Sequence, residues 1–148
     1  DPLLAAGAGG RLTTDGDLSA WSRAILPCCE VVTPNVPEAE VLARRPIRNR
    51  EDMVDAARII AAGCGVAVVI KGGHLEGPHV DDVLSEAGGR VTVFRRRRLL
   101  ASVHGSGCTF SATLAGGLAL GNDLADAVWM AGNAVVERLV RAARRTER

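Results

Sequence analysis

Lysine is almost absent from the sequence, and so is net charge. Of the 18 lysine and arginine residues only Lys71 is a lysine, and 17 acidic residues leave a formal net charge of +1. Nucleic acids and membrane surfaces usually require a strong basic excess in the protein that binds them, so we expect neither partner. A chain that uses arginine elsewhere either needs the compact ammonium group at residue 71 or has it there by chance.

Long apolar runs and paired cysteine motifs are also missing. No apolar run reaches the roughly 18 residues that a membrane span needs, and the first residues do not have the pattern of a signal peptide. The four cysteines include no Cys-x-x-Cys pair, which argues against a zinc site and a disulfide framework. We therefore expect a soluble, cytoplasmic protein with reduced thiols, in which Cys28, Cys29 and Cys64 are buried or half-buried.

An initiator methionine is absent, and the chain begins with DPLL. An Asp-Pro pair followed by small apolar residues is typical of a strand that leaves a sheet, so we expect the fold to begin upstream of residue 1. The 148 residues lie in the size range of one domain, and 47% of them are hydrophobic, which is enough for a core.

Helical and strand patterns alternate along the chain. Apolar residues recur on one helical face of residues 50–65, and VAVVIKGG is an apolar strand of the kind that is buried on both faces. The helical face consists of Met53, Ala56, Ala57, Ile60 and Ala61. The expected order is helix 15–26, strand 29–35, helix 37–44, helix 50–65, strand 66–73, a hairpin over 79–95 with its turn at Gly88-Gly89, helix 108–121 and helix 123–145. This order predicts an α/β layered fold with a mainly parallel sheet.

The motif HGSGC, His104 to Cys108, leads into a predicted helix. Glycines let a ligand approach the backbone, and the helix start offers N–H groups and partial positive charge to an anion such as a transferring phosphoryl group. The same field favours the thiolate form of a cysteine, which can then accept a proton from a hydroxyl group. The alternative is a glycine-rich helix entry in which Cys108 is a small buried apolar residue.

Two further strand ends carry polar residues. TPNVPEAE places Asn35 and Glu38 at the carboxyl end of a strand, where α/β proteins bind ligands, and Glu38 could hold Mg²⁺ or could stabilise the start of its helix. VIKGGH places Lys71 at the same predicted sheet edge. These residues and the HGSGC motif together form a coherent set for phosphoryl transfer.

TPNVPEAEVL, VVIKGGH and HGSGCTFSATLAGGLALG, in this order and spacing, resemble the C-terminal half of hydroxymethylpyrimidine/phosphomethylpyrimidine kinases. These are thiamine-biosynthesis enzymes of the ribokinase-like superfamily, and the resemblance covers nearly the whole chain. It implies that residues 1–148 form the C-terminal part of a single three-layer α/β/α kinase domain. It also implies ATP and Mg²⁺ as cofactors, a pyrimidine alcohol or its phosphate as the small-molecule substrate, and a homodimer.

The resemblance assigns roles to individual residues. Cys108 replaces the catalytic aspartate of most sugar kinases in the superfamily as the base, and Gly105, Ser106 and Gly107 complete the anion hole with it. The other matching positions are Asn35 and Glu38 for Mg²⁺ and phosphates, Lys71 for the nucleotide phosphates, and Asp1 near the metal and triphosphate.

Other assignments remain open. Pyridoxal kinases of the same superfamily share a cysteine at this position, so pyridoxal is an alternative acceptor. Members of the family are longer, and strands absent from this chain contain most of their pyrimidine-binding residues, so a truncated, non-catalytic nucleotide-binding or interaction domain is a further alternative. The run Arg95–Arg98 could steer ATP or form a solvated strand end, and Trp129 is expected in a core or an interface.

Overall fold

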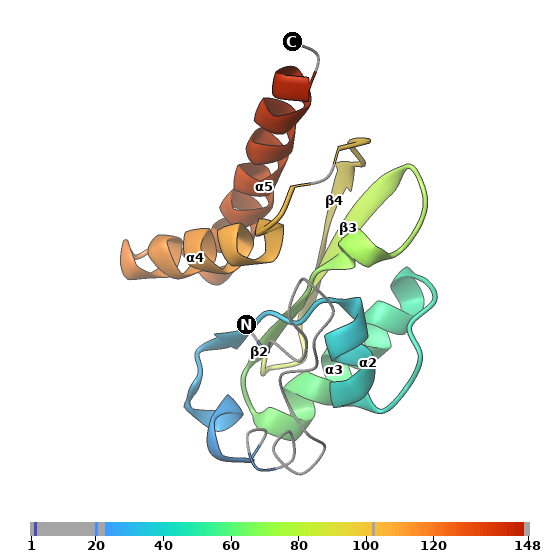
Figure 1. Ribbon diagram of the computed structural model, residues 1–148. Coiled ribbons are helices and arrows are strands. Elements are labelled where there is room, and N and C mark those ends of the chain that lie inside the picture. Colours follow the sequence, from blue (N-terminus) through green and yellow to red (C-terminus); the bar gives the residue numbers. More distant parts are fainter. Residues whose placement is uncertain (1, 3–19, 21–22, 102, 147–148) are drawn as a thin grey trace. The chain divides into compact units, whose positions relative to one another are not determined.

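The computed structural model describes residues 2, 20, 23–101 and 103–146, and side chains as far as residue 144. The chain divides into two compact units, Asp1–Arg95 and Arg96–Arg148 (Figure 1). Most of the expected helix 15–26 lies outside the described residues, and a short 3-10 helix, η1, follows at Leu26–Cys28. Of the helices described, none combines the length and the apolar character that a membrane crossing would need.

Within the described residues a mixed four-stranded sheet confirms the predicted α/β class, but the expectation of a mainly parallel sheet is not met there, because the hairpin adds β3 and β4 in antiparallel directions. Its strands are β1 (Val31–Val32), β2 (Ala67–Ile70), β3 (His79–Ser85) and β4 (Val91–Arg97), in that spatial order. The parallel part is the pair β1 and β2, in which Val32 lies opposite Val68. β3 runs antiparallel to β2, with Ile70 opposite Val83, and leads into β4 through a hairpin.

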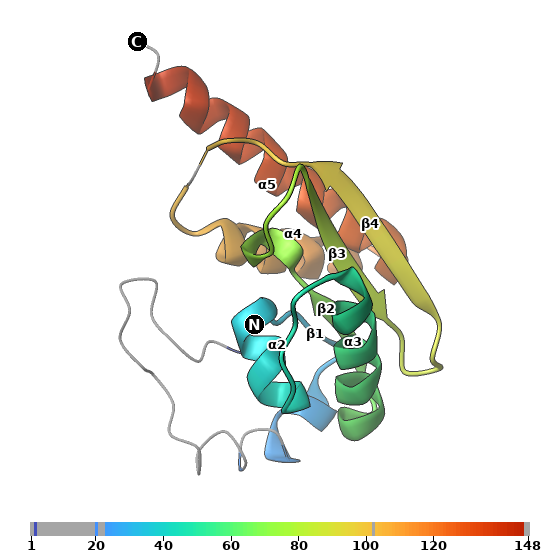
Figure 2. The ribbon, with the colours of Figure 1, turned by 90° about the vertical axis from the view of Figure 1, so that its right-hand side faces the viewer.

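The helices α2 (Val36–Ala43) and α3 (Arg50–Cys64) pack on each other, and α3 lies against β2 and β3 (Figure 2). The face of α3 predicted from the sequence is confirmed, because all five of its residues are buried. They form one apolar cluster with Val68, Ile70 and Val83 of the sheet. A helix with a single apolar stripe is stable only when that stripe is covered, and here the sheet covers it.

The expectations for the buried strand and the hairpin are also confirmed. Every residue of β2 is buried, as a near-continuous apolar run predicts. At the hairpin turn the Glu86 N–H donates to the Arg90 carbonyl at 2.9 Å, and the Gly89 N–H donates to the Glu86 carbonyl at 2.9 Å. Further along, Arg95 binds Asp81 through two hydrogen bonds of 2.8 Å each, which tie β4 to β3.

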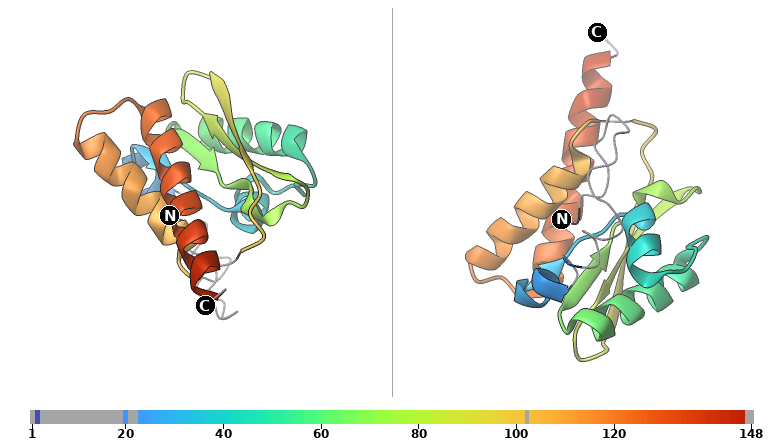
Figure 3. Two further views of the ribbon diagram at one scale, coloured as in Figure 1. Left: turned by 90° about the horizontal axis from the view of Figure 1, so that it is seen from above. Right: turned by 60° about the horizontal axis from the view of Figure 1, so that its bottom comes forward.

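The second unit contains the helices α4 (Ser106–Ala119) and α5 (Leu124–Thr146), which pack against each other (Figure 3). They approach closely at Gly117, where a β-carbon would lie 3.2 Å from the β-carbon of Ala127. Asp123 begins α5 by accepting the Asp126 N–H at 2.8 Å. Both helices were expected from the sequence, although α4 begins at Ser106, two residues before the expected start.

The arginine run does not act as one solvated group. Arg95 pairs with Asp81, whereas the Arg96 guanidinium lies over the Trp129 ring, 4.8 Å from its centroid, and donates to the Trp129 carbonyl at 3.2 Å. Arg97 is exposed, as a strand end predicts. Trp129 is 47% exposed and is therefore not a core residue. Its indole ring instead packs against the Arg96 guanidinium.

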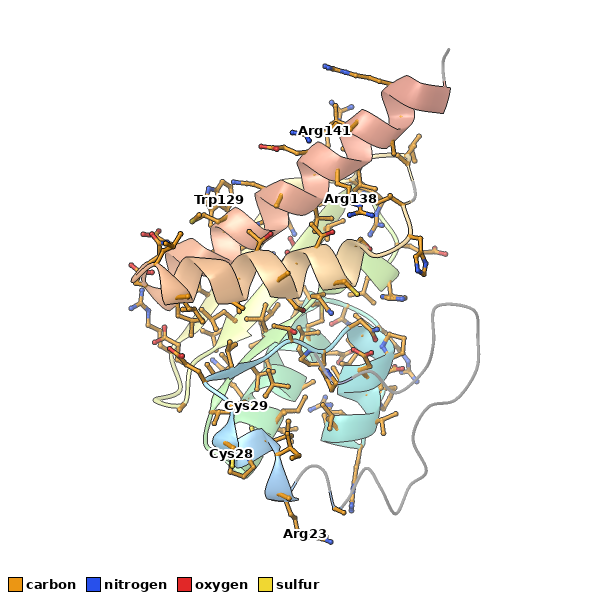
Figure 4. All side chains as sticks on the ribbon, turned by 60° about the vertical axis from the view of Figure 1, so that its left-hand side comes forward. Arg23, Cys28, Cys29, Trp129, Arg138 and Arg141 are labelled. Carbon is orange, nitrogen blue, oxygen red and sulfur yellow. The ribbon has the colours of Figure 1, made fainter. Side chains whose placement is uncertain are left out.

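One expectation about the cysteines is wrong. Cys29 and Cys64 are half-buried, as expected, but Cys28 is exposed, because η1 buries only Leu26. The thiols of Cys28 and Cys29 donate to the carbonyls of Ala24 and Ile25 at 3.4 Å each (Figure 4). All four cysteines are free thiols, which agrees with the absence of a disulfide framework from the sequence.

Two adjacent isoleucines of α3 test how the core is built. Ile60 is 5% exposed and Ile59 is 46% exposed. Ile60→Ala should lower the free energy of unfolding by about 2–5 kcal/mol, because it removes buried methyl groups and leaves a cavity. Ile59→Ala, the matched control, should change it by less than about 0.5 kcal/mol. Urea unfolding followed by circular dichroism measures both, and equal losses would contradict the described core.

The Asp81–Arg95 pair should make stability depend on pH. The hydrogen bonds from Arg95 hold the pKa of the Asp81 carboxyl below its ordinary value of 3.8, although partial burial opposes them, and Arg50 and His79 lower it further. Because this pKa is lower in the folded state, the stabilisation exists above pH 3.8 and is lost as the pH falls through the folded-state pKa. Asp81→Asn should therefore cause a small loss of stability at pH 7 that disappears in acid.

Thermal unfolding of wild type and Asp81→Asn between pH 7 and pH 2 measures this dependence. A difference between the two proteins that stays constant into acid would mean that the loss comes from packing and not from charge.

Candidate active site

Asn35 and Glu38 form a reciprocal cap at the start of α2. The Glu38 N–H donates to the Asn35 side-chain oxygen at 3.0 Å, and the Asn35 N–H donates to the Glu38 carboxylate at 2.7 Å. Glu38 is only 4% exposed, so its carboxylate is held in one orientation at the positive end of the helix. The helix-start interpretation of Glu38 is therefore confirmed, and its predicted role toward Mg²⁺ and phosphates stays a prediction.

The carboxyl ends of β1 and β2 bring Lys71 beside Asn35. The Lys71 N–H donates to the Pro34 carbonyl at 2.9 Å, and Asn35 and Lys71 form a parallel bridge just beyond the two strands. Lys71 is half-buried there. The sequence-based expectation that Asn35, Glu38 and Lys71 belong to one sheet edge is met, and ligands of α/β proteins bind at this edge.

The turn after Lys71 is fixed by β3. A second 3-10 helix, η2, spans Gly72–His74, and the Gly72 N–H donates at 3.1 Å to the carboxylate of Asp82, which is 5% exposed. A β-carbon on Gly72 would collide with the backbone carbonyl of Asp81, so only glycine allows this approach. Neither contact was expected from the sequence. The available signal was the pair of aspartates in VDDVL, because a strand points adjacent side chains to opposite faces.

The motif HGSGC forms the predicted helix start in the second unit. Gly105 is the N-cap of α4 in the left-handed region (φ +82°), and Ser106, Gly107 and Cys108 occupy the first turn. The first intrahelical bond joins the Thr109 N–H to the Gly105 carbonyl at 2.9 Å. The amides of the three preceding residues therefore lie at the end of the helix that attracts anions.

Cys108 is exposed, which contradicts the alternative of a small buried apolar residue. It lies in the first turn of α4, and its predicted role as the base stays a prediction.

The predicted residues thus form two groups. Asn35, Glu38 and Lys71 share one sheet edge of the first unit, and Gly105–Cys108 share one helix start of the second. Asp1 lies outside the described residues. That the two groups act on one substrate stays a prediction.

A family model described as phosphomethylpyrimidine kinase matches residues 1–147. The chain belongs to this family. Among curated relatives, it is 36% identical over 148 residues to a hydroxymethylpyrimidine/phosphomethylpyrimidine kinase of Rhizobium meliloti, covering 99% of this chain and 55% of the relative. The similar kinase of Bacillus subtilis is 33% identical over 138 residues, covering 93% of this chain and 51% of the relative. The chain therefore spans about half the length of these members of the family.

Solved structures of kinases share the fold. The pyridoxal kinase of Staphylococcus aureus aligns with a TM-score of 0.79 and 32% identity, over 85% of this chain and 47% of that one. The phosphomethylpyrimidine kinase of Clostridium difficile aligns with a TM-score of 0.74 and 28% identity, over 93% of this chain and 55% of that one. The S. aureus kinase has been solved with ADP and with AMP-PCP. These ribokinase-like neighbours confirm the predicted fold class.

Glu38 is the predicted magnesium ligand that lies among the described residues. Within the part of the chain that the structure describes, no three histidine, cysteine or acidic residues gather into a metal cluster. Mg²⁺ typically takes one or two carboxylates and completes its shell with water and substrate phosphates, so a single fixed carboxylate meets this requirement, and magnesium binding itself stays a prediction.

Gly72→Ala should destabilise the turn that follows Lys71. The added methyl group would meet the rigid backbone of β3, and we expect a loss of about 1–3 kcal/mol in the free energy of unfolding. Gly73→Ala is the matched control, because a β-carbon there would have no atom within 4 Å; it should cost less than about 0.5 kcal/mol. Urea unfolding compares the two variants, and similar losses would contradict the described close approach at Gly72.

Proposed function

We propose that this chain supplies the phosphate-handling part of an ATP-dependent kinase acting on 4-amino-5-hydroxymethyl-2-methylpyrimidine and on its monophosphate, in thiamine diphosphate biosynthesis. The observation that carries the proposal is that Cys108 is exposed in the first turn of α4, the turn that follows the left-handed N-cap Gly105. The chain that contains this turn belongs to the phosphomethylpyrimidine kinase family. The capped edge at Asn35, Glu38 and Lys71 supplies further groups suited to nucleotide phosphates.

In the first reaction the substrate hydroxyl attacks the γ-phosphorus of ATP. Cys108 accepts the hydroxyl proton, a bond forms between the substrate oxygen and phosphorus, and the bond to the β-phosphate oxygen breaks to release ADP. The amides of the α4 first turn stabilise the charge on the transferring group, and Lys71 binds the nucleotide phosphates. Bound Mg²⁺, held by Glu38 and by Asp1, would neutralise phosphate charge.

The second reaction has a different requirement. Its acceptor is already an ionised phosphate, so proton removal matters less and electrostatic stabilisation by the α4 first turn matters more. Cys108 substitutions should therefore affect the first phosphorylation more strongly than the second.

Pyridoxal is the second candidate acceptor. The specific observation in its favour is the alignment with S. aureus pyridoxal kinase over 85% of this chain at a TM-score of 0.79. A further candidate is a nucleotide-binding or interaction domain without turnover, because the chain spans about half the length of its curated relatives. We expect a homodimer in the cytoplasm, and sedimentation velocity of the purified chain tests the oligomeric state.

Coupled ADP release by the purified chain distinguishes these functions. Hydroxymethylpyrimidine, its monophosphate and pyridoxal are offered separately with Mg·ATP. Cys108→Ala should lower kcat on hydroxymethylpyrimidine by about 10²–10⁴-fold, since a positioned base contributes that much. Cys28→Ala removes another exposed thiol, from the first unit, and should leave the rate unchanged.

Each outcome assigns one function. Turnover on the pyrimidines that collapses only in Cys108→Ala supports the proposal, and turnover on pyridoxal alone replaces it with the second candidate. No turnover together with calorimetric binding of ADP supports the non-catalytic candidate. A folded chain that neither turns over nor binds ADP overturns both kinase functions and the nucleotide-binding domain, and leaves the interaction domain.

A further inference from the structure

Arg138 of α5 makes two contacts with the segment around the start of α4. Its Nη1 donates to the Thr109 hydroxyl at 3.2 Å, and its Nη2 donates to the His104 carbonyl at 3.1 Å. The same nitrogen would lie 3.7 Å from a β-carbon placed on Gly105. The guanidinium group of Arg138 therefore bridges the N-cap of α4, from His104 before the cap to Thr109 after it (Figure 4).

Thr109 extends the contact to Gly105. Its hydroxyl donates to the Gly105 carbonyl at 2.9 Å while it accepts from Arg138. The carbonyls of His104 and Gly105 are thus both engaged, one by Arg138 directly and one through Thr109. Because a peptide unit is planar and trans, a carbonyl held in one direction turns the N–H of the next residue in the opposite direction.

We propose that Arg138 is a positioning residue for the anion-binding turn Gly105–Cys108. This inference rests on the proposed function, in which that turn receives the transferring phosphoryl group. By holding the His104 carbonyl directly and the Gly105 carbonyl through Thr109, the guanidinium orients the N–H groups of Gly105 and Ser106 away from itself before any ligand binds. Preorganised donors cost no reorganisation during the reaction, and the fixed positive charge near the turn adds to the attraction for phosphate.

The geometry needs an arginine and this particular position on α5. A guanidinium group can donate to two acceptors in a fixed plane, whereas a lysine ammonium group is a compact point charge without that fork. Arg141, about one turn further along α5, pairs instead with Glu137 at 3.5 Å, and its side chain is 79% exposed. It provides a control with the same charge on the same helix (Figure 4).

Amide hydrogen exchange tests the positioning directly and does not depend on catalysis. In Arg138→Met the Thr109 amide, which closes the first turn of α4, should exchange about fivefold faster than in wild type. The substitution removes the stabilisation that about one hydrogen bond contributes to this turn. Arg138→Lys should recover part of the protection, and Arg141→Met should match wild type. Unchanged exchange of Thr109 in Arg138→Met would overturn the inference.

Steady-state kinetics test the consequence for the nucleotide site. In Arg138→Met the KM for ATP should rise about fivefold, with partial rescue in Arg138→Lys, while the KM for hydroxymethylpyrimidine should not change. A merely structural role would lower kcat through a smaller folded fraction and leave both KM values unchanged. That result, or an equal effect in Arg141→Met, would overturn the role of Arg138 in the nucleotide site.

The two measurements separate this inference from the function on which it rests. If the wild-type chain shows neither turnover nor ADP binding, the proposed function fails, and the Thr109 exchange rate still decides whether Arg138 positions the turn. If the chain is active and only Arg138→Met loses ATP affinity and Thr109 protection, both conclusions hold.

Discussion

The backbone hydrogen bond from Lys71 to Pro34 is the constraint on which the arrangement of the first unit depends. It extends the parallel pairing of β1 and β2 by one step beyond the strands, to the residues at which both change direction. On one side α2 begins at once, and its cap fixes Asn35 and Glu38 to each other. On the other side the chain enters η2, which Asp82 holds from β3. The side chains of Asn35, Glu38 and Lys71 are therefore attached to backbone segments whose positions are fixed by hydrogen bonds.

Features determined by neighbours in sequence were predictable. The buried face of α3 follows from apolar residues at helical spacing, and the burial of β2 follows from its continuous apolar run. The caps follow the same logic: an asparagine three residues before a glutamate satisfies two backbone N–H groups at α2, and a glycine-rich entry admits the left-handed residue at Gly105. In each case the residues that determine the feature lie within a few positions of one another in the sequence.

Contacts between distant residues were not predictable from the same patterns. Asp82 is ten residues from Gly72, and Arg138 is 34 residues from His104, so no periodicity relates the partners. The run of four arginines lies at the end of β4, and Arg95 and Arg97 are exposed, as predicted. The run itself did not indicate that Arg95 pairs with Asp81 or that Arg96 stacks on Trp129. Sequence patterns predicted the candidate site residues, and the tertiary structure shows which residues hold them in place.

The stacking of Arg96 on Trp129 gives the molecule an intrinsic optical reporter. The guanidinium fits there because residue 132 has no side chain; a β-carbon on Gly132 would collide with it. Arg96 is also the residue at which the first unit passes into the second. Indole fluorescence responds to a cation over the ring, so the contribution of Trp129 to the emission should report whether the Arg96 guanidinium is stacked on it.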